Sequence, residues 1–268
     1  MNVAAHAWHW SERLGRSAAA AVTELGYIAA LLAESVWWIA VGRRHRQPVR
    51  IAPVLAEMME IGVHAVPICA LLLFTVGLML AIQGLHTLET FGAQTKLVPL
   101  VALSITREFA PLIVGILVAG RSGSALAARI GTMQVSQEID ALRVIGINPV
   151  RYLVAPSLVA MLIMLPVLTV LADFVGVAGA AVYGAPRLDI DYAVFGAQTL
   201  EALEAGDVLQ GVAKAAIFAL LIALIACSTG FAVTGGAEGV GRAATRAVVV
   251  SISSVVVADM AFTFVLTR

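Results

Sequence analysis

The sequence predicts an all-α membrane protein with an N-terminal interfacial helix, five transmembrane helices and a short amphipathic helix on the cytoplasmic side. Of its 268 residues, 60% are hydrophobic and only 13% are charged, whereas soluble domains carry about 25% charged residues. The mean hydropathy is +0.95. This composition excludes an ordinary soluble domain and indicates a chain that crosses the membrane several times.

Five runs of residues are long and apolar enough to cross a bilayer. They are Ala65–Leu85, Leu97–Ala119, Tyr152–Tyr183, Val208–Val233 and Ala247–Leu266. The third run is long for a simple crossing, and we expect it to tilt or to project beyond the bilayer.

The distribution of Lys and Arg predicts the orientation of these spans. If the N-terminus is cytoplasmic, the inside segments contain twelve basic residues and the outside segments contain only Lys96, Arg187 and Arg268. Cytoplasmic loops are enriched in basic residues. We therefore expect a cytoplasmic N-terminus and a C-terminus on the outer side.

The apolar segment Tyr27–Val41 is shorter than the five spans and contains Glu34. Its tryptophans, Trp37 and Trp38, directly precede the basic run Arg43–Arg46. Indole rings favour the head-group region and arginines favour the anionic cytoplasmic surface, so we predict a helix that lies in the interface. The alternative is a sixth spanning helix.

Three charged residues lie near the middle of predicted spans. Arg107 and Glu108 are adjacent in the second span, and Asp259 lies in the fifth. A charge at mid-membrane costs about 2.5–3.5 kcal/mol on insertion scales, so such residues indicate a packed interior or a polar cavity. Neighbouring helical residues point about 100° apart. We therefore expect one of Arg107 and Glu108 to pair with another helix and the other to line a cavity, although these charges could also simply hold helices together.

A proline follows this charged pair. Pro111 has no N–H group, so the carbonyl of Arg107, four residues earlier, loses its helical partner.

The remaining polar residues favour structural roles. Asp173 and Lys214 lie nearer the predicted outer surface. There we expect them either to have a structural role or to snorkel, extending the charged group to the membrane surface. The segment Pro186–Asp207 is acidic, which predicts a solvated loop that connects two spans. The glycine-rich stretch from Gly120 lacks the Gly-Lys-Ser/Thr ending of a nucleotide-binding loop. No metal-ligand pattern stands out, and the pattern of residues does not predict an enzyme.

The second inside segment, Met133–Ile147, is amphipathic. Ile139, Leu142 and Ile145 recur at helical spacing, and Gly146 is a suitable stop for the helix. The apolar stripe requires a cover, which is either the membrane surface or a soluble partner docked against it.

Several of these motifs, in this order, resemble those of the MlaE/YrbE permease family. They are Arg107–Pro111, Ala119–Gly131, Met133–Leu142 with Asn148-Pro149, and Gly241–Val249 followed by Asp259. The resemblance covers roughly residue 50 to the C-terminus. It implies a division into residues 1–50, with N-terminal amphipathic helices, and residues 51–268, the permease domain.

The resemblance implies the membrane subunit of an ABC transporter that moves phospholipids between the inner membrane and the outer envelope of a Gram-negative bacterium. The implied partners are a second copy of the chain, a cytoplasmic ABC ATPase, a periplasmic hexamer of MCE-domain proteins and, in some systems, a STAS-domain subunit. It implies no nucleic acid. ATP and Mg²⁺ would bind to the ATPase, so the chain itself is expected to need no cofactor and to catalyse no reaction.

The resemblance also assigns residues. Those implied around a lipid cavity at the dimer centre are Leu80, Gln83, Leu88, Phe91, Arg107, Glu108 and Phe109. The implied coupling helix, which would dock into the ATPase, contains Glu138, Ile139, Asp140, Leu142 and Arg143. Asp259 is expected to be a further polar partner inside the membrane.

Two other functions compete with this hypothesis. A secondary transporter could use Glu108 and Asp259 as proton sites, although five spans without an evident inverted repeat argue against it. A passive membrane scaffold for an MCE assembly would need no polar site. The sequence leaves the direction of transport and the exact lipid open.

Overall fold

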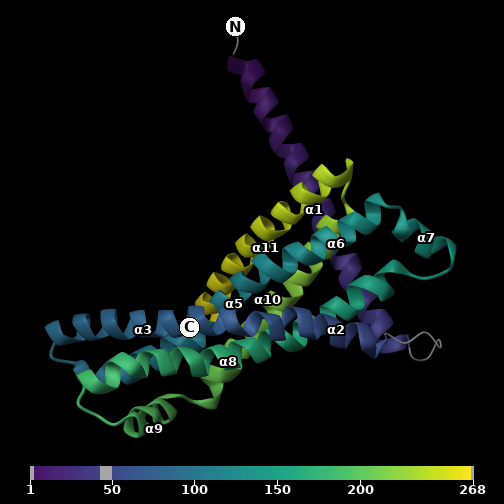
Figure 1. The fold of residues 1–268 in the computed structure, drawn as a ribbon. Helices are drawn as coiled ribbons and strands as arrows, with labels where there is room; N and C mark the ends of the chain where they lie inside the picture. Colours follow the sequence, from purple (N-terminus) through teal and green to yellow (C-terminus); the bar gives the residue numbers. More distant parts are fainter. Residues whose placement is uncertain (1–2, 43–49, 267–268) are drawn as a thin grey trace.

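The computed structural model describes residues 3–42 and 50–266, with side chains for residues 22–42 and 50–265. Its regular elements in these ranges are all helices (Figure 1). The α-helices are α1 (Val3–Val41), α2 (Ile51–Ile61), α3 (Val66–Thr90), α4 (Leu97–Ser104), α5 (Ala110–Val118), α6 (Ser124–Val135), α7 (Glu138–Val144), α8 (Ala155–Arg187), α9 (Tyr192–Ala202), α10 (Ala205–Phe231) and α11 (Gly236–Leu266). Short 3₁₀ turns, Val63–Ala65 and Gln94–Lys96, precede α3 and α4.

All five predicted spans lie in helices, which confirms the all-α membrane architecture. Six helical stretches among the described residues are long and apolar enough to cross a membrane. Five of them overlap the predicted spans, and the sixth is Val22–Val41 near the N-terminus. This sixth stretch is part of one continuous helix of 39 residues. The basic run Arg43–Arg46 falls outside the described residues.

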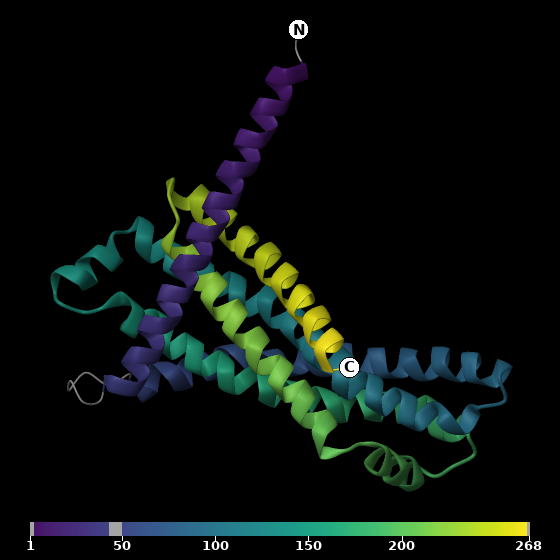
Figure 2. The same cartoon turned by 180° about the vertical axis from the view of Figure 1, so that it is seen from behind.

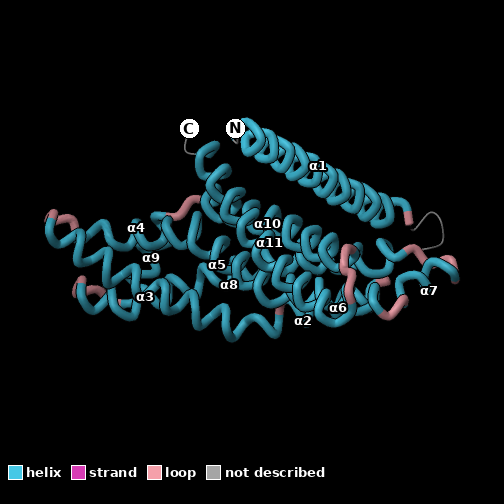
Figure 3. The backbone as a smooth tube through the Cα atoms, turned by 90° about the horizontal axis from the view of Figure 1, so that it is seen from above, coloured by secondary structure: helices cyan, strands magenta, loops and turns pink. Residues whose placement is uncertain are grey.

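Helix α1 lies on the outside of the bundle and crosses the ends of α8 and α10 (Figures 2 and 3). Its Leu31 is buried, and the Glu34 carboxylate accepts a hydrogen bond of 2.7 Å from the amide of Asn148. The guanidinium of Arg151 stacks on the Trp38 ring, 5.5 Å from its centroid. The N-terminal helix is therefore attached to the bundle through polar and cation–π contacts near the start of α8.

Helices α3 and α8 pack side by side along their length because glycines let their backbones approach closely (Figure 1). A Cβ atom on Gly77 would lie 1.9 Å from the carbonyl oxygen of Gly176. One on Gly179 would lie 2.2 Å from the carbonyl oxygen of Phe74. Any side chain at these positions would push the two helices apart.

Two π-helical turns each precede an Ala-Pro pair. Ile105–Phe109 leads into Ala110-Pro111, and Val150–Val154 leads into Ala155-Pro156. In each turn the alanine N–H donates to the carbonyl five residues earlier. Because the proline that follows has no N–H, the helix cannot continue its ordinary bonding there and widens by one residue. The expected distortion at Pro111 is thus a π-helical turn that contains Arg107 and Glu108.

A third π-helical turn, Ala119–Gly123, leads into α6, and one arginine of the turn and one of α6 bind α2. Arg121 donates a hydrogen bond of 2.8 Å to the carbonyl of Glu60, and Arg129 forms an ion pair with Glu57. These contacts give the basic residues of the Ala119–Gly131 motif a structural role.

The loop between α8 and α10 was predicted incorrectly. It contains the helix α9, whose Phe195 is buried with an exposed fraction of 2%. The apolar residues of α9 are separated by small and polar ones, so the hydropathy pattern of this segment is too weak to predict a helix. Asp207, the last residue of the predicted loop Pro186–Asp207, lies in the first turn of α10 and is buried rather than solvated.

We predict that Gly77→Ala destabilises the protein by about 3 kcal/mol, because the added methyl group would overlap a backbone carbonyl that has no room to move. The matched control is Gly120→Ala, where a Cβ atom meets nothing within 4 Å. Thermal unfolding in detergent measures both. Equal unfolding temperatures would contradict the close packing of α3 on α8.

Candidate functional site

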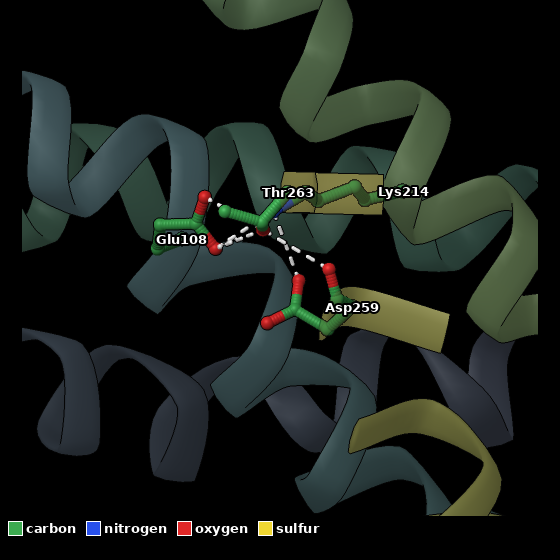
Figure 4. Close-up of polar contacts among 4 residues, drawn as sticks. All are labelled: Glu108, Lys214, Asp259 and Thr263. Carbon is green, nitrogen blue, oxygen red and sulfur yellow. Dashed lines mark hydrogen bonds and ion pairs between the residues drawn. The ribbon is translucent and has the colours of Figure 1, made fainter. Parts of the chain in front are cut away.

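A charge cluster of Glu108, Lys214, Asp259 and Thr263 joins three parts of the bundle (Figure 4). The ammonium of Lys214, on α10, lies 2.7 Å from Glu108 Oε2 and 2.9 Å from Asp259 Oδ1. It also donates to the Thr263 hydroxyl at 3.0 Å. That hydroxyl lies 3.1 Å and 3.2 Å from the two oxygens of Glu108. The cluster therefore connects the π-helical turn, α10 and α11.

Burial explains why the cluster needs two carboxylates around one cation. The Lys214 side chain has an exposed fraction of 0%, whereas the values are 13% for Asp259 and 35% for Glu108. An ammonium without a partner would be very costly in this position, and opposite charges with hydrogen bonds offset that cost. With all three groups ionised the cluster carries one net negative charge, and its more exposed acid is Glu108.

Arg107 forms a second ion pair with α10. Its Nε and Nη2 atoms lie 2.7 Å and 2.5 Å from Asp207 Oδ1. The other oxygen of Asp207 accepts a hydrogen bond of 2.9 Å from the backbone N–H of Glu204, which completes a capping box at the start of α10. The capping box therefore fixes the Asp207 carboxylate, and this carboxylate fixes the guanidinium of Arg107 through the ion pair.

The expectation that Arg107 and Glu108 face different neighbours is wrong, because both pair with α10. Asp207 and Lys214 are seven residues apart, which places them on the same side of that helix two turns from each other. The π-helical turn and the length of the arginine side chain let both residues reach this side. Arg107 is nevertheless half-exposed, with an exposed fraction of 46%.

Of the two roles expected for Lys214, the structural one is confirmed and snorkelling is excluded, since its ammonium is buried between helices. A signal for this role was present in the sequence. A lysine inside an apolar run fits an interior position with acidic partners as well as it fits a snorkelling one. Asp259, the expected polar partner inside the membrane, lies against this same lysine.

The other residues implied around a lipid cavity are distributed along α3 and the π-helical turn. Leu80 and Leu88 pack against the hydrophobic core, whereas Gln83 is exposed and Phe91, at the end of α3, has an exposed fraction of 78%. Phe109 is half-buried. Within the single chain, these side chains do not gather with Arg107 and Glu108 in one described pocket.

The predicted amphipathic helix forms as α7, which ends at Val144 and is followed by Gly146 at a φ angle of 80°. This confirms the predicted stop. Ile139 is fully buried by the chain itself, so neither a membrane nor a partner is needed to cover it. Val144 and Ile145 are exposed at 87% and 67%.

The charged residues of α7 face outward beside this exposed apolar tip. Glu138 and Asp140 are exposed, Leu142 is half-buried, and Arg143 pairs with Asp140 at 2.9 Å. In Figure 1, α7 projects from the end of the bundle that is opposite α9.

Comparison with known proteins assigns the chain to a family. The family described as Permease MlaE matches residues 54–265. A probable ABC transporter permease of Rickettsia conorii is 38% identical over 204 residues, which cover 76% of this chain and 79% of that protein. The chain belongs to the MlaE permease family.

Two further relatives have names that state a function or a location. The intermembrane phospholipid transport system permease protein MlaE of Haemophilus influenzae is 35% identical over 199 residues, covering 74% of this chain and 76% of that protein. The chloroplastic protein TRIGALACTOSYLDIACYLGLYCEROL 1 of Arabidopsis thaliana is 36% identical over 205 residues, covering 76% of this chain and 59% of that protein.

As an MlaE-family permease, the protein is a multi-pass membrane subunit of an ABC transporter. It is not itself an enzyme, because in such transporters a separate ATPase subunit hydrolyses ATP. The charge cluster is therefore part of a transport subunit rather than a catalytic centre.

We predict that Lys214→Met lowers the free energy of unfolding by about 3–5 kcal/mol, because it leaves two acids facing each other without a cation. Arg242→Met is the matched control, since Arg242 pairs with Glu238 on the exposed surface of α11 and should change stability by only about 0–1 kcal/mol. Unfolding in detergent, followed by circular dichroism, measures both. Similar small losses in the two variants would contradict the structural role of the cluster.

Proposed function

We propose that the protein is the permease of an ABC transporter that moves phospholipids between the inner membrane and the outer envelope. The half-exposed Arg107 is the observation that carries this proposal. Two of its nitrogen atoms bind Asp207, and its remaining N–H groups are free of that ion pair. A guanidinium fixed in this way, inside an apolar bundle, is suited to bind a lipid phosphate.

The lipid pathway would form between two copies of the chain. Helix α11 presents an exposed apolar surface that includes Val256, Val257, Met260 and Phe264, close in sequence to Asp259 of the charge cluster. A second copy packed against this helix would enclose Glu108 and Arg107. Gln83 and Phe91 are exposed on α3 and would complete the cavity from there, with Leu80, Leu88 and Phe109 behind them.

The energy for transport would enter through α7. Its buried Ile139 anchors it to the bundle, while Val144, Ile145 and the charged residues beside them form a small exposed surface for an ATPase. Movement of α7 on ATP binding would be passed to α6 and to the π-helical turn Ala119–Gly123 that precedes it. ATP and Mg²⁺ belong to that ATPase, and this chain would need no cofactor of its own.

The remaining members of the proposed complex are those that the resemblance to the MlaE/YrbE family implies. On the side of α9, lipid would be exchanged with a hexamer of periplasmic MCE-domain proteins, and a STAS-domain subunit could join the ATPase on the other side. The membrane would be the inner membrane of a Gram-negative bacterium, with the N-terminus in the cytoplasm, as the positive charges predict.

We predict that Arg107→Leu reduces lipid transfer about tenfold or more, since a hydrogen bond to a charged group contributes about 1.5–3 kcal/mol. Arg107→Lys should retain part of the activity because it keeps the positive charge. Arg187→Leu, at the exposed end of α8, is the control and should leave transfer unchanged. Transfer of a fluorescent phospholipid from proteoliposomes by the complete complex measures the effect. Unchanged transfer in Arg107→Leu would contradict the proposal and favour a passive scaffold.

We predict that Glu138→Lys combined with Arg143→Glu abolishes co-purification of the ATPase, because the reversed charges would oppose those of the docking surface. Both side chains are exposed, so the chain should still fold. Glu201→Lys on α9, at the opposite end of the bundle, is the control. An ATPase that remains bound to the α7 variant would exclude this helix as its docking site.

A further inference from the structure

A cleft with a volume of about 460 Å³ lies between α8, α9 and the start of α10. We call it the lateral cleft. Its volume is within the range of small-molecule sites, about 300–1,000 Å³. Phe174 and Leu200 line it and are exposed at 72% and 75%, so it opens on the outer surface of the bundle. Helix α9, which supplies part of the lining, lies at the end of the bundle away from α7 (Figures 1 and 2).

Two polar side chains in the wall of the lateral cleft lack hydrogen-bond partners. The first is Thr106, which is 1% exposed and whose hydroxyl has no hydrogen-bond partner. Thr199, which lines the same cleft, donates to the carbonyl four residues earlier at 2.9 Å, as helical threonines commonly do. Asp173 Oδ1 is also buried and without a partner. Because buried polar atoms are almost always hydrogen-bonded, Thr106 and Asp173 are the candidate polar contacts for a ligand held in the cleft.

The charge of the lateral cleft specifies the chemistry of that ligand. Asp173 and Glu204 line it, and no Lys, Arg or His is among its lining residues. The other lining side chains are mainly apolar. A ligand that fits must therefore combine an apolar body with a positively charged hydrogen-bond donor, while a ligand with only an anionic head group would meet two carboxylates.

We propose that the lateral cleft binds a membrane lipid with a protonated amine in its head group, with one acyl chain against Phe174 and Leu200 and the ammonium beside Asp173. The chain is a multi-pass membrane protein, so lipids surround its spans and can reach an opening on the outer surface of the bundle. This site is separate from the proposed cavity at Arg107, and it depends on the proposed function only in taking the chain to be surrounded by lipid.

Thr106 connects the lateral cleft with the part of the chain that forms the two ion pairs. Thr106 belongs to the same π-helical turn as Arg107 and Glu108. Its carbonyl oxygen lies against α10, where a Cβ atom on Gly211 would be 2.5 Å away. An occupied cleft would therefore contact the turn that holds both ion pairs.

Photo-cross-linking tests this site directly in the full chain reconstituted in nanodiscs. Two probes with identical photoactivatable acyl chains are compared, one with an ethanolamine head group and one with a glycerol head group. Labelled peptides are identified by mass spectrometry. We expect the ethanolamine probe to label residues 170–208 at least threefold more strongly than the glycerol probe.

Two variants and a matched control separate the cleft from general lipid contact. Gly196→Leu should fill the cleft without disturbing the backbone, because a Cβ atom there meets nothing within 4 Å. It should lower labelling by the ethanolamine probe at least threefold. Ala197→Leu adds the same apolar group next to it on α9, outside the lining of the cleft, and should leave labelling unchanged. Asp173→Asn should remove the preference for ethanolamine.

Three results would overturn the proposal. They are equal labelling by the two probes in the unmodified chain, equal labelling of the Gly196→Leu and Ala197→Leu variants, and a cleft that neither probe labels because a partner's helix covers it. Ethanolamine-selective labelling in a complex that transfers no phospholipid would support this site and count against the proposed function, so the two failures can be distinguished.

Discussion

The arrangement of the bundle depends on one buried ammonium, that of Lys214. In a bilayer, apolar side chains gain little by meeting each other rather than lipid, so close backbone contact and polar pairing determine how helices associate. Both occur in this protein. Glycines bring α3 against α8, while Lys214 draws Glu108 and Asp259 together from two other elements (Figure 4). A displaced α11 or a straightened π-helical turn would leave buried charges unpaired.

Pro111 explains why this buried charge cluster lies next to charged groups that are partly exposed. It widens the preceding turn, and that turn presents Arg107 and Glu108 to the same side of α10. Each is paired yet partly exposed, so neither is free to move and both remain accessible. An arginine that is oriented before a ligand arrives loses less entropy on binding a phosphate than a mobile one would. The name of the Haemophilus influenzae relative states that it belongs to a phospholipid transport system, which supports the proposal that this ligand is a lipid.

Local patterns predicted the elements well, and contacts between elements poorly. The five spans followed from hydropathy, and the stop at Gly146 followed from the conformational freedom of glycine. The burial of Lys214 was missed because a lysine within an apolar run can either snorkel or pair, and only the positions of the neighbouring helices decide between these. The sequence did not predict that Arg107 and Glu108 both pair with α10, because the expected 100° separation assumes a regular α-helix and these residues lie in a π-helical turn. The residues assigned around a lipid cavity remain predictions, since their meeting point would require a second copy.

The most direct test of the central role of Lys214 is a double-mutant cycle with Glu108. The variants Lys214→Met, Glu108→Gln and their combination are unfolded in the same detergent, and the free energies are compared with that of the unmodified protein. If the ammonium holds the π-helical turn, the combined loss will be smaller than the sum of the single losses, with a coupling of about 1 kcal/mol or more. Additive losses would show that the two side chains do not interact and would contradict the account.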